Sequence, residues 1–375
     1  MEYREFGKMG IKLSRLGFGA MRLPHVQGEK EVDVEKSVQI IHRAFELGVN
    51  YIDTAYMYND YQSENIVGQA VKSWKNHKIY VSTKNPKSGE TGAVWRACLE
   101  EQLKKLDLPF IDIYHMHGIT WKQYEENISK PGGPMDEARR AKREGLIHHI
   151  CFSFHDTPDK LVKLVDTGNY ESVTVQYNLL DRSNEKEIEY AHEKGLGVVV
   201  MGPVGGGRLA APSEPLMNLI PGGVKSTAEA ALRFVLANPN VDVAISGMNT
   251  IEMVEENCAI ASRTDGLSPS EIKKIQEMLE ENKRLADLYC TGCNYCMPCP
   301  NEVNIPVNFR YMNYHRVYGM TETAKRLYGK IGAENWWIKG KNASACIECG
   351  QCEPKCPQKI PIIKQLKETH ETLGK

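Results

Sequence analysis

Four ionisable side chains that could reduce a carbonyl lie at or just past the ends of β-rich, apolar runs: Asp53, Tyr58, Lys84 and His117. Reduction of a carbonyl requires a hydride and a proton, and a tyrosine hydroxyl can donate the proton as a general acid. A free tyrosine has a pKa of about 10. A neighbouring Lys84 cation favours the phenolate, so we expect it to lower the pKa of Tyr58.

The other two residues complete this scheme. Asp53 would hold Lys84 charged and in place, and His117 would hydrogen-bond the substrate carbonyl and orient it toward the hydride. Each residue alone has a simpler reading, in which the aspartate caps a turn, the lysine lies on the surface and the histidine lines the rim. Four complementary groups on consecutive strand ends favour the catalytic reading, because catalytic side chains converge at the carboxyl ends of barrel strands.

A second group of reactive residues lies near the C-terminus, where eight of the 11 cysteines fall between Cys290 and Cys356. They form two runs, each followed by a proline: Cys290, Cys293, Cys296 and Cys299, then Cys346, Cys349, Cys352 and Cys356. The second run has the C-x2-C-x2-C-x3-C spacing of bacterial-type ferredoxins, in which three close thiolates hold one iron–sulfur cluster and the fourth cysteine ligates the other.

We therefore expect two 4Fe-4S clusters, one held by Cys290, Cys293, Cys296 and Cys356 and one held by Cys346, Cys349, Cys352 and Cys299. Zinc is the alternative, because two C-x2-C pairs can form a four-cysteine zinc site, but two runs of four with trailing prolines favour iron and sulfide. The first run is one residue shorter before its last cysteine than the second. The remaining cysteines lie in helix or strand patterns and are expected to be buried apolar residues: Cys98, Cys151 and Cys258.

Short apolar runs alternate with amphipathic helical stretches over about 250 residues. The predicted strands are Leu16–Leu23, Val49–Thr54, Ile79–Thr83, Phe110–His115, Ile147–Phe154, Val173–Tyr177, Val198–Met201 and Val241–Ser246. Consecutive apolar positions are typical of parallel strands buried on both faces, and eight such units predict a closed (β/α)8 TIM barrel. An open doubly wound sheet is the alternative, but the Gly-x-Gly-x-x-Gly turn that often follows its first strand does not occur here.

Connections between the runs add detail to this barrel. Tyr3–Phe6 and Ile11–Ser14 flank Gly7–Gly10 and predict a small hairpin that closes the barrel floor. Two long connections, Gly118–Pro134 and Val204–Lys225, follow strand ends, and long loops in a compact domain are usually functional.

A composition change near residue 265 predicts a domain boundary. Residues 1–265 would form the barrel, and residues 266–375 a small, mainly helical iron–sulfur domain. A charged helix, Glu271–Leu288, leads into the cysteine segment, and the stretch between the two cysteine runs has helical patterns over Val307–Gly319 and Glu322–Gly329.

The barrel half resembles the aldo/keto reductase family. The resemblance rests on Asp53-Thr-Ala-Tyr-Met-Tyr58 followed by Ser63-Glu64, on Thr83-Lys84 and on Asp112-Ile-Tyr-His-Met-His117, and it covers nearly all of residues 1–262. It implies an NAD(P)H-dependent reductase of a small carbonyl substrate, with Asp53, Tyr58, Lys84 and His117 as its catalytic tetrad. It also implies cofactor contacts at Met21, Arg22, Ser153, Gln176, Gly202, Pro203, Gly247, Glu256 and Asn257.

Some positions depart from the family pattern. The family commonly has Ser-Asn after its fifth strand to bind the nicotinamide carboxamide and an aromatic ring after its seventh, whereas this chain has Ser153-Phe154 and Met201. The loop Gly247–Met253 has no lysine or arginine, although members that prefer NADP often carry a basic residue there. A 2′-phosphate would lack its usual charged partner, so both NADP(H) and NAD(H) stay open.

The tail resembles helical two-cluster ferredoxin domains, which places the chain with an iron–sulfur-carrying branch of the family. Nicotinamide moves two electrons together as hydride and each cluster moves one, so direct exchange would need a flavin or similar mediator. No certain flavin motif is found. We expect the clusters to exchange electrons with a redox protein partner or to serve structure. The alternative function, favoured by Phe154 and Met201, is an electron-transfer protein whose barrel is a binding scaffold.

The composition is that of an ordinary globular protein, with 41% hydrophobic and 25% charged residues. A net charge of −1 gives no reason to bind nucleic acid or an anionic membrane. The charged segment Met1–Lys8 does not read as a signal peptide, and no apolar run is long enough to span a bilayer. Clustered cysteines without an export signal indicate a reducing compartment, so we expect a cytoplasmic protein.

Overall fold

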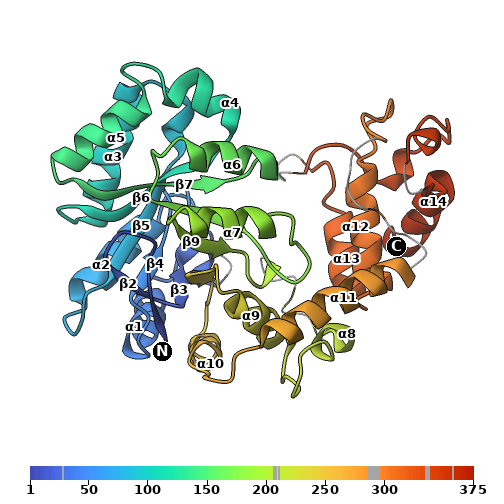
Figure 1. The fold of residues 1–375 in the computed structure, drawn as a ribbon, viewed down its shortest axis with the longest axis horizontal. Helices are drawn as coiled ribbons and strands as arrows, with labels where there is room; N and C mark the ends of the chain where they lie inside the picture. Colours follow the sequence, from blue (N-terminus) through green and yellow to red (C-terminus); the bar gives the residue numbers. More distant parts are fainter. Residues whose placement is uncertain are drawn as a thin grey trace. The chain divides into compact units, whose positions relative to one another are not determined.

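A closed barrel of parallel strands dominates the computed structural model, which describes residues 1–27, 29–205, 209, 212–285, 290, 296–333, 338–356 and 359–375. Within these residues eight strands are hydrogen-bonded in the order β10-β3-β4-β5-β6-β7-β8-β9. Their bounds are β3 Leu16–Gly19, β4 Tyr51–Asp53, β5 Tyr80–Asn85, β6 Ile111–Ile119, β7 Ile147–Phe154, β8 Ser172–Gln176, β9 Gly197–Met201 and β10 Val243–Ser246. The predicted (β/α)8 TIM barrel is confirmed (Figure 1).

Helices cover the outside of the strands (Figure 1). The longer ones are α1 Val34–Glu46, α2 Ser63–Ser73, α3 Gly92–Leu106, α5 Pro134–Arg143, α6 Pro158–Asp166, α7 Glu185–Glu193, α9 Thr227–Ala237 and α10 Ile251–Ala261. Short turns are η1 Ala20–Arg22, η2 Pro86–Gly89, α4 Trp121–Gln123 and η3 Tyr124–Ile128. In α5, for example, Met135, Ala138 and Ala141 are buried at a spacing of three while the intervening residues are mostly charged, so one face packs on the barrel.

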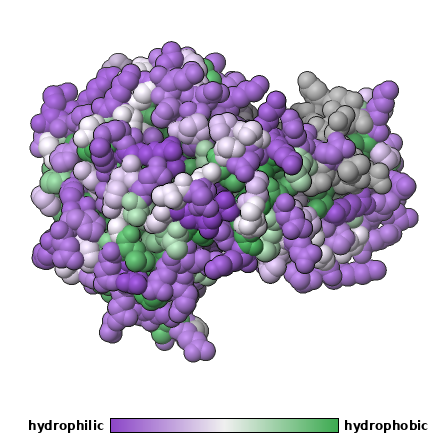
Figure 2. Space-filling view, turned by 60° about the horizontal axis from the view of Figure 1, so that its bottom comes forward, coloured by the Kyte–Doolittle hydropathy of each residue, from purple (hydrophilic) through white to green (hydrophobic). Residues whose placement is uncertain are grey.

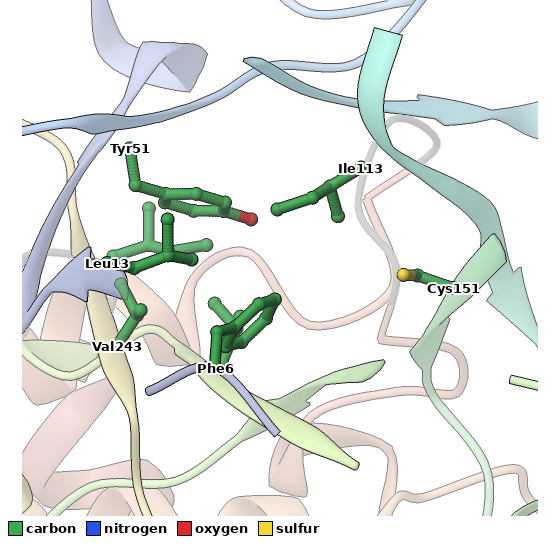
Figure 3. Close-up of a cluster of buried hydrophobic side chains, with 8 residues drawn as sticks. Phe6, Leu13, Tyr51, Ile113, Cys151 and Val243 are labelled. Atoms are coloured by element: carbon green, nitrogen blue, oxygen red, sulfur yellow. The ribbon is translucent and has the colours of Figure 1, made fainter. Parts of the chain in front are cut away.

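The predicted hairpin is confirmed as β1 (Tyr3–Glu5) paired antiparallel with β2 (Lys12–Ser14). Phe6 and Leu13 are fully buried and share a hydrophobic cluster with Tyr51 and Ile113 from the barrel interior (Figure 3). A Cβ on Gly197, the first residue of β9, would overlap the Phe6 ring. Glycine there lets the Phe6 ring pack directly against the start of β9, which closes the floor of the barrel.

Two strands run further than their apolar patterns indicate. β5 was expected to end at Thr83 and β6 at His115, but the ladder continues through the pairs Lys84↔His115 and Asn85↔Met116. The backbones keep pairing where the inward side chains become polar, so hydrophobicity alone places the strand ends too early. Lys84 and His117 therefore lie inside strands, and the backbone of Lys84 is paired with that of His115 in the neighbouring strand.

The chain divides into two compact units, Met1–Gly206 with Ala231–Gly266 and Gly207–Ala230 with Leu267–Lys375. All of the long connection Val204–Lys225 from Gly207 onward thus groups with the C-terminal residues. Within that unit, the Ser213 hydroxyl donates a hydrogen bond to the carbonyl oxygen of Tyr318 at 2.6 Å. The boundary at residue 265 stays a prediction.

The second unit is mainly helical in its described residues. Its elements are α8 Glu214–Met217, α11 Pro269–Leu285, α12 Ile305–Arg316, α13 Thr321–Tyr328, η5 Ala343–Ala345, η6 Glu353–Lys355 and α14 Ile362–Leu373. Asn304 begins α12 by accepting a hydrogen bond from the backbone N–H of Val307, as N-cap residues do. The helix expected over Glu271–Leu288 is described only to Leu285, and the rest of that prediction lies outside the described residues.

The face of the molecule in Figure 2 is mostly hydrophilic, with hydrophobic residues in small groups between charged ones. Among the described helices, none has both the length and the apolar content that crossing a bilayer requires.

Glu171, just before β8, joins three groups at the floor of the barrel. Its carboxylate accepts hydrogen bonds from the backbone N–H of Ile150 at 3.0 Å and the Lys142 ammonium at 2.7 Å, and it lies 2.9 Å from His149 Nδ1. Burial acts to raise the pKa of Glu171, but these three partners outweigh it and lower the pKa to about 2. The carboxylate therefore stabilises the folded barrel at neutral pH.

We expect Glu171→Gln to lower the free energy of unfolding by about 1 kcal/mol at pH 7. Because the folded pKa lies below the ordinary value of 4.5, this stabilisation is complete above that value and disappears as the pH falls toward about 2. Urea unfolding of wild type and variant, followed by tryptophan fluorescence, measures the difference at each pH. An equal deficit at pH 7 and pH 3 would contradict the assignment, and exposed Glu189→Gln serves as the control.

Candidate active site

Lys84 is the centre of the candidate site at the open end of the barrel. Its ammonium forms an ion pair with Asp53 and donates hydrogen bonds to the carbonyl oxygen of Thr54 at 2.8 Å and the hydroxyl of Tyr58 at 3.3 Å. Asp53 ends β4 and Lys84 lies in β5, so adjacent strands position the pair. Three of the four residues predicted as a tetrad are thus directly hydrogen-bonded.

The ion pair is almost completely removed from solvent, with Asp53 3% and Lys84 2% exposed. The second carboxylate oxygen of Asp53 accepts a hydrogen bond from the Ser82 hydroxyl at 2.9 Å. Burial acts to lower the pKa of Lys84, but Asp53 and Tyr58 outweigh it, and the net pKa is raised. Lys84 is therefore an ammonium at neutral pH.

The strand that carries Lys84 is supported from its outer side by a buried polar network. The side-chain amide of Gln102, from α3, donates to the backbone carbonyl of Lys84 at 3.1 Å and to the carboxyl group of Glu64 at 2.5 Å. The Thr83 hydroxyl also donates to Glu64, at 2.7 Å. Helices α2 and α3 thus fix the backbone of β5 at Lys84.

Burial raises the pKa of Tyr58 above its ordinary value, and the Lys84 cation opposes this effect without cancelling it. The expectation that Lys84 would bring this pKa below that of a free tyrosine is wrong for this structure. The free energy lost when the Tyr58 phenolate is removed from water is larger than the free energy gained from its attraction to the Lys84 ammonium. Tyr58 is consequently protonated at neutral pH, which is the form that a general acid requires.

Tyr58 is followed by an uncommon turn. Asn59, Asp60 and Tyr61 have φ angles of 51°, 50° and 68°, a left-handed backbone that is costly for residues with side chains. The side-chain amide of Asn59 donates a hydrogen bond to the carbonyl oxygen of Ala20 at 2.8 Å. This bond ties the turn that carries Tyr58 to the segment that follows β3.

His117 lies at a bulge in β6. The β6–β7 ladder is irregular between Met116 and Ile119, so His117 and Gly118 together oppose the single residue Ser153. The Ser153 hydroxyl oxygen accepts a hydrogen bond from the backbone N–H of Gly118 at 2.7 Å. Bulges next to active sites redirect side chains. The hydrogen bond to Ser153 stabilises the backbone of this bulge.

The His117 ring faces Tyr58 edge-on, with ring centroids 6.3 Å apart. Burial, and then the Lys84 cation, lower the pKa of His117 to about 3. The imidazole is therefore neutral at physiological pH and keeps one N–H donor. A neutral donor beside a protonated phenol can hydrogen-bond the oxygen of a carbonyl group.

The residues expected to contact the cofactor lie on the other side of the barrel mouth. Met21 and Arg22 are in η1, Ser153 in β7 and Gln176 at the end of β8, while Gly202 and Pro203 follow β9, Gly247 follows β10, and Glu256 and Asn257 are in α10. In the closed barrel the strands β7, β8, β9, β10 and β3 form one continuous arc, and β4, β5 and β6, which position the tetrad, form the rest.

Two glycines in this arc leave space beside polar side chains. Gly202 has a φ of +65°, and a Cβ there would lie 2.8 Å from the Gln176 side-chain oxygen. A Cβ on Gly247 would lie 3.2 Å from Cδ of Arg22. Glycine at these two places lets the side chains of Gln176 and Arg22 lie against the backbone at the barrel mouth, where the amide and guanidinium supply polar partners for a ligand. The residues present therefore fit a nicotinamide nucleotide.

The two residues that depart from the family pattern, Phe154 and Met201, point in different directions. Phe154 is only 2% exposed. It follows the inward-facing Ser153 and therefore points to the outside of the strand, where it packs against Phe152 with ring centroids 6.5 Å apart. Met201 ends β9 and is paired with Ile245, on the same strand face as the core residue Val199. Met201 thus faces the barrel mouth, whereas Phe154 does not.

His155, the first residue after β7, was not among the site residues predicted from the sequence. Strand side chains alternate between faces, so Cys151 in the core and Ser153 at the bulge place His155 on the inner face as well.

Cysteines from both runs line one pocket in the second unit. Cys299 of the first run lies there with Cys346, Cys349 and Cys352 of the second. These four thiols are the set expected for the second cluster, and thiolates are the ligands of 4Fe-4S clusters. The residues present therefore fit such a cluster.

The remaining cysteines divide by their place in the structure. Cys296 also lines this pocket, whereas Cys293 lies outside the described residues. Cys98, Cys151 and Cys258 are buried, as predicted, and burial raises the pKa of all three thiols. Buried thiols with raised pKa values are unreactive, which separates these three from the cysteine runs.

Comparison with protein families gives two matches. A model described as the aldo/keto reductase family matches residues 15–280, and one described as a 4Fe-4S dicluster domain matches residues 289–360. The first covers the barrel and the second covers both cysteine runs. The second match favours iron–sulfur clusters over zinc.

Similar proteins share the barrel. An uncharacterized oxidoreductase, YqkF of Bacillus subtilis, is 29% identical over 315 residues, which cover 75% of this chain and 98% of that protein. L-galactose dehydrogenase of Arabidopsis thaliana is 26% identical and covers 76% of this chain and 96% of its own length. The structure of aldo-keto reductase AKR11C1 from Bacillus halodurans has a TM-score of 0.64 and 27% identity, over 74% of this chain and 96% of that one.

Proposed function

Since the chain belongs to the aldo/keto reductase family and carries a 4Fe-4S dicluster domain, we propose that it reduces an aldehyde or ketone with NAD(P)H. Tyr58 is the general acid in this proposal. The observation that carries the proposal is the buried Lys84 ammonium bonded to both Asp53 and the Tyr58 hydroxyl. A protonated phenol held beside a fixed cation is a proton donor whose conjugate base is stabilised as it forms.

Each residue of the tetrad has a separate role in this proposal. When bound, the nicotinamide supplies the hydride that adds to the carbonyl carbon. Tyr58 gives its hydroxyl proton to the carbonyl oxygen, and Lys84, 3.3 Å from that hydroxyl, stabilises the resulting phenolate. Neutral His117 donates a hydrogen bond to the same oxygen and orients the carbonyl.

The cofactor would lie along the arc of β7 to β3. Gln176, Gly202 and Gly247 would frame it, and the Ser153 hydroxyl, which accepts a hydrogen bond from Gly118, keeps its own proton to donate to the nicotinamide carboxamide. NADP(H) and NAD(H) both stay candidates, because Gly247–Met253 contains no basic residue, whereas the Arg22 side chain runs beside Gly247.

For the second unit we propose that the clusters exchange single electrons with a redox protein rather than with the nicotinamide. Two residues of the cysteine pocket are open to the outside, Cys349 and Ile347, the latter 66% exposed. A partner could therefore approach the pocket closely. Rapid bleaching of the clusters when NADPH or NADH is mixed with flavin-free protein would contradict this proposal.

We also propose a cytoplasmic location. Buried free thiols at Cys98, Cys151 and Cys258 and cysteine runs suited to clusters are typical of a reducing compartment.

An anaerobic preparation offered NADPH or NADH and a set of small aldehydes and ketones tests the main proposal. Consumption of the cofactor with equal formation of alcohol supports it, and iron, sulfide, flavin and bound nicotinamide are measured on the same sample. The second candidate, an electron-transfer protein with the barrel as a scaffold, is favoured by Phe154 facing away from the mouth. It predicts normal cluster spectra with no alcohol from any carbonyl compound.

The proposed chemistry predicts a flat pH profile near neutrality. The acid must be protonated, and the pKa of Tyr58 is raised above the ordinary 10.0, while that of His117 is lowered to about 3. Neither group changes charge between these values, so we expect kcat/KM for reduction to stay constant from about pH 6 to 9 and to fall above about pH 10. A midpoint near pH 7 in kcat/KM would contradict these roles.

A further inference from the structure

His155 stands at the open end of the barrel beside the proposed catalytic residues. Strand β7 points Cys151 into the hydrophobic core and Ser153 toward the bulge of β6. His155 continues this alternation one residue past the end of the strand. Its side chain therefore projects inward at the level where side chains of barrel enzymes meet substrates.

The bulge brings the His155 ring next to His117. Gly118, which follows His117, has a φ of +60°, and a Cβ on it would lie 3.3 Å from Cδ2 of His155. Glycine at this position leaves room for the ring of His155 to rest on the backbone of Gly118. The His155 ring thus lies against the backbone of the residue that follows His117.

Both the position and the charge of His155 suit a ligand contact. The side chain is exposed to solvent, yet burial is the first cause of its lowered pKa, followed by the Lys84 cation. A neutral imidazole offers one hydrogen-bond donor and one acceptor, which a hydroxyl group can satisfy together.

The loop that carries His155 is held to the neighbouring loop. The carboxylate of Asp156 accepts a hydrogen bond from the backbone N–H of Trp121 at 3.0 Å. Together with the Ser153–Gly118 bond, this contact fixes the backbone on both sides of His155. A preorganised polar group contributes more to selectivity than a mobile one.

We propose that His155 hydrogen-bonds a second oxygen of the substrate, so that the site selects aldehydes or ketones with a hydroxyl group close to the carbonyl. This inference rests on the proposed carbonyl reduction, in which Tyr58 and His117 bind the carbonyl oxygen. Because His155 lies beside His117, the second oxygen lies near the first, as in small hydroxyaldehydes.

The test compares glyceraldehyde, which has hydroxyl groups next to its carbonyl, with propanal, which has the same carbon skeleton without them. The readout is the ratio of their kcat/KM values. We expect wild type to favour glyceraldehyde by about tenfold, the effect of one hydrogen bond, and His155→Ala to lose this preference. His155→Asn, which keeps a donor and an acceptor, should retain most of it.

A control variant and a binding measurement separate the other outcomes. His192→Ala removes a partly exposed histidine near the opposite end of the barrel and should keep the wild-type ratio. If His155→Ala keeps the wild-type ratio of kcat/KM values for glyceraldehyde and propanal, the inference is overturned and the reductase proposal stands. The same holds if fluorescence titration shows weaker binding of reduced nicotinamide while that ratio is unchanged. No reduction of either aldehyde by wild type overturns both.

Discussion

Tyr58→Phe is expected to lower kcat for carbonyl reduction by about 10³-fold while the binding of reduced nicotinamide is unchanged. Loss of a positioned general acid costs about 10²–10⁴-fold. The phenylalanine ring keeps the packing of Tyr58 against Lys84, whose Nζ lies 4.9 Å from the ring centroid, so the change removes only the hydroxyl. Steady-state kinetics and fluorescence titration of the cofactor measure the two effects separately.

Tyr56→Phe is the matched control for this variant. Tyr56 lies two residues earlier, and its hydroxyl donates to the carboxylate of Glu101 at 2.9 Å, outside the proposed site. Its removal should leave kcat within about twofold of wild type. If Tyr58→Phe kept more than a tenth of wild-type turnover, the phenol would not be the proton donor.

Cys299→Ser is expected to remove one of the two clusters. Cys299 comes from the first cysteine run but lines the pocket with Cys346, Cys349 and Cys352 of the second, where it would be the fourth ligand. A serine hydroxyl is a poor substitute for a thiolate, so the iron content should fall from about eight to about four atoms per chain. Iron and sulfide analysis of anaerobically prepared protein measures the loss.

Cys98→Ser controls for the loss of a thiol as such. Cys98 is buried in the barrel, and its pKa is raised to about 12, so it has no role in cluster binding and its variant should keep the full iron content. Because hydride transfer is proposed to bypass the clusters, Cys299→Ser should still reduce aldehydes. Full iron in Cys299→Ser would show that another residue completes the pocket cluster.

The barrel was predictable because its signals are local and repeated. Each of the eight strands follows from an apolar run, and β7 has the predicted bounds, Ile147–Phe154. The ends of β5 and β6 were placed too early because Lys84 and His117 are polar where the backbone ladder still continues. Apolar patterns report which side chains are buried in the core, not where backbone hydrogen bonds stop.

The candidate site was predictable in its residue types but not in its energetics. Asp53, Tyr58 and Lys84 meet as their spacing indicated, because parallel strands bring their carboxyl ends together. The balance between burial and charge at Tyr58 depends on how much water the fold excludes, which no spacing reveals. The bulge at Gly118 and the inward place of His155 likewise depend on the register of two strands.

The grouping of Gly207–Ala230 with the C-terminal residues could not be read from the sequence either. The connection follows a barrel strand, and its link to Tyr318 through the Ser213 hydroxyl joins residues that are 105 positions apart. A contact between such distant segments has no local signature, since neither serine nor a backbone carbonyl is unusual in a loop.

Transfer of deuterium from labelled cofactor to product tests the account most directly. Protein prepared without oxygen is mixed with glyceraldehyde and reduced nicotinamide that carries two deuterium atoms on the hydride-donating carbon, and the glycerol formed is analysed by mass spectrometry. Direct hydride transfer with Tyr58 as the acid predicts one deuterium per glycerol from wild type and almost no glycerol from Tyr58→Phe. Unlabelled glycerol, or labelled glycerol formed equally by both proteins, would contradict it.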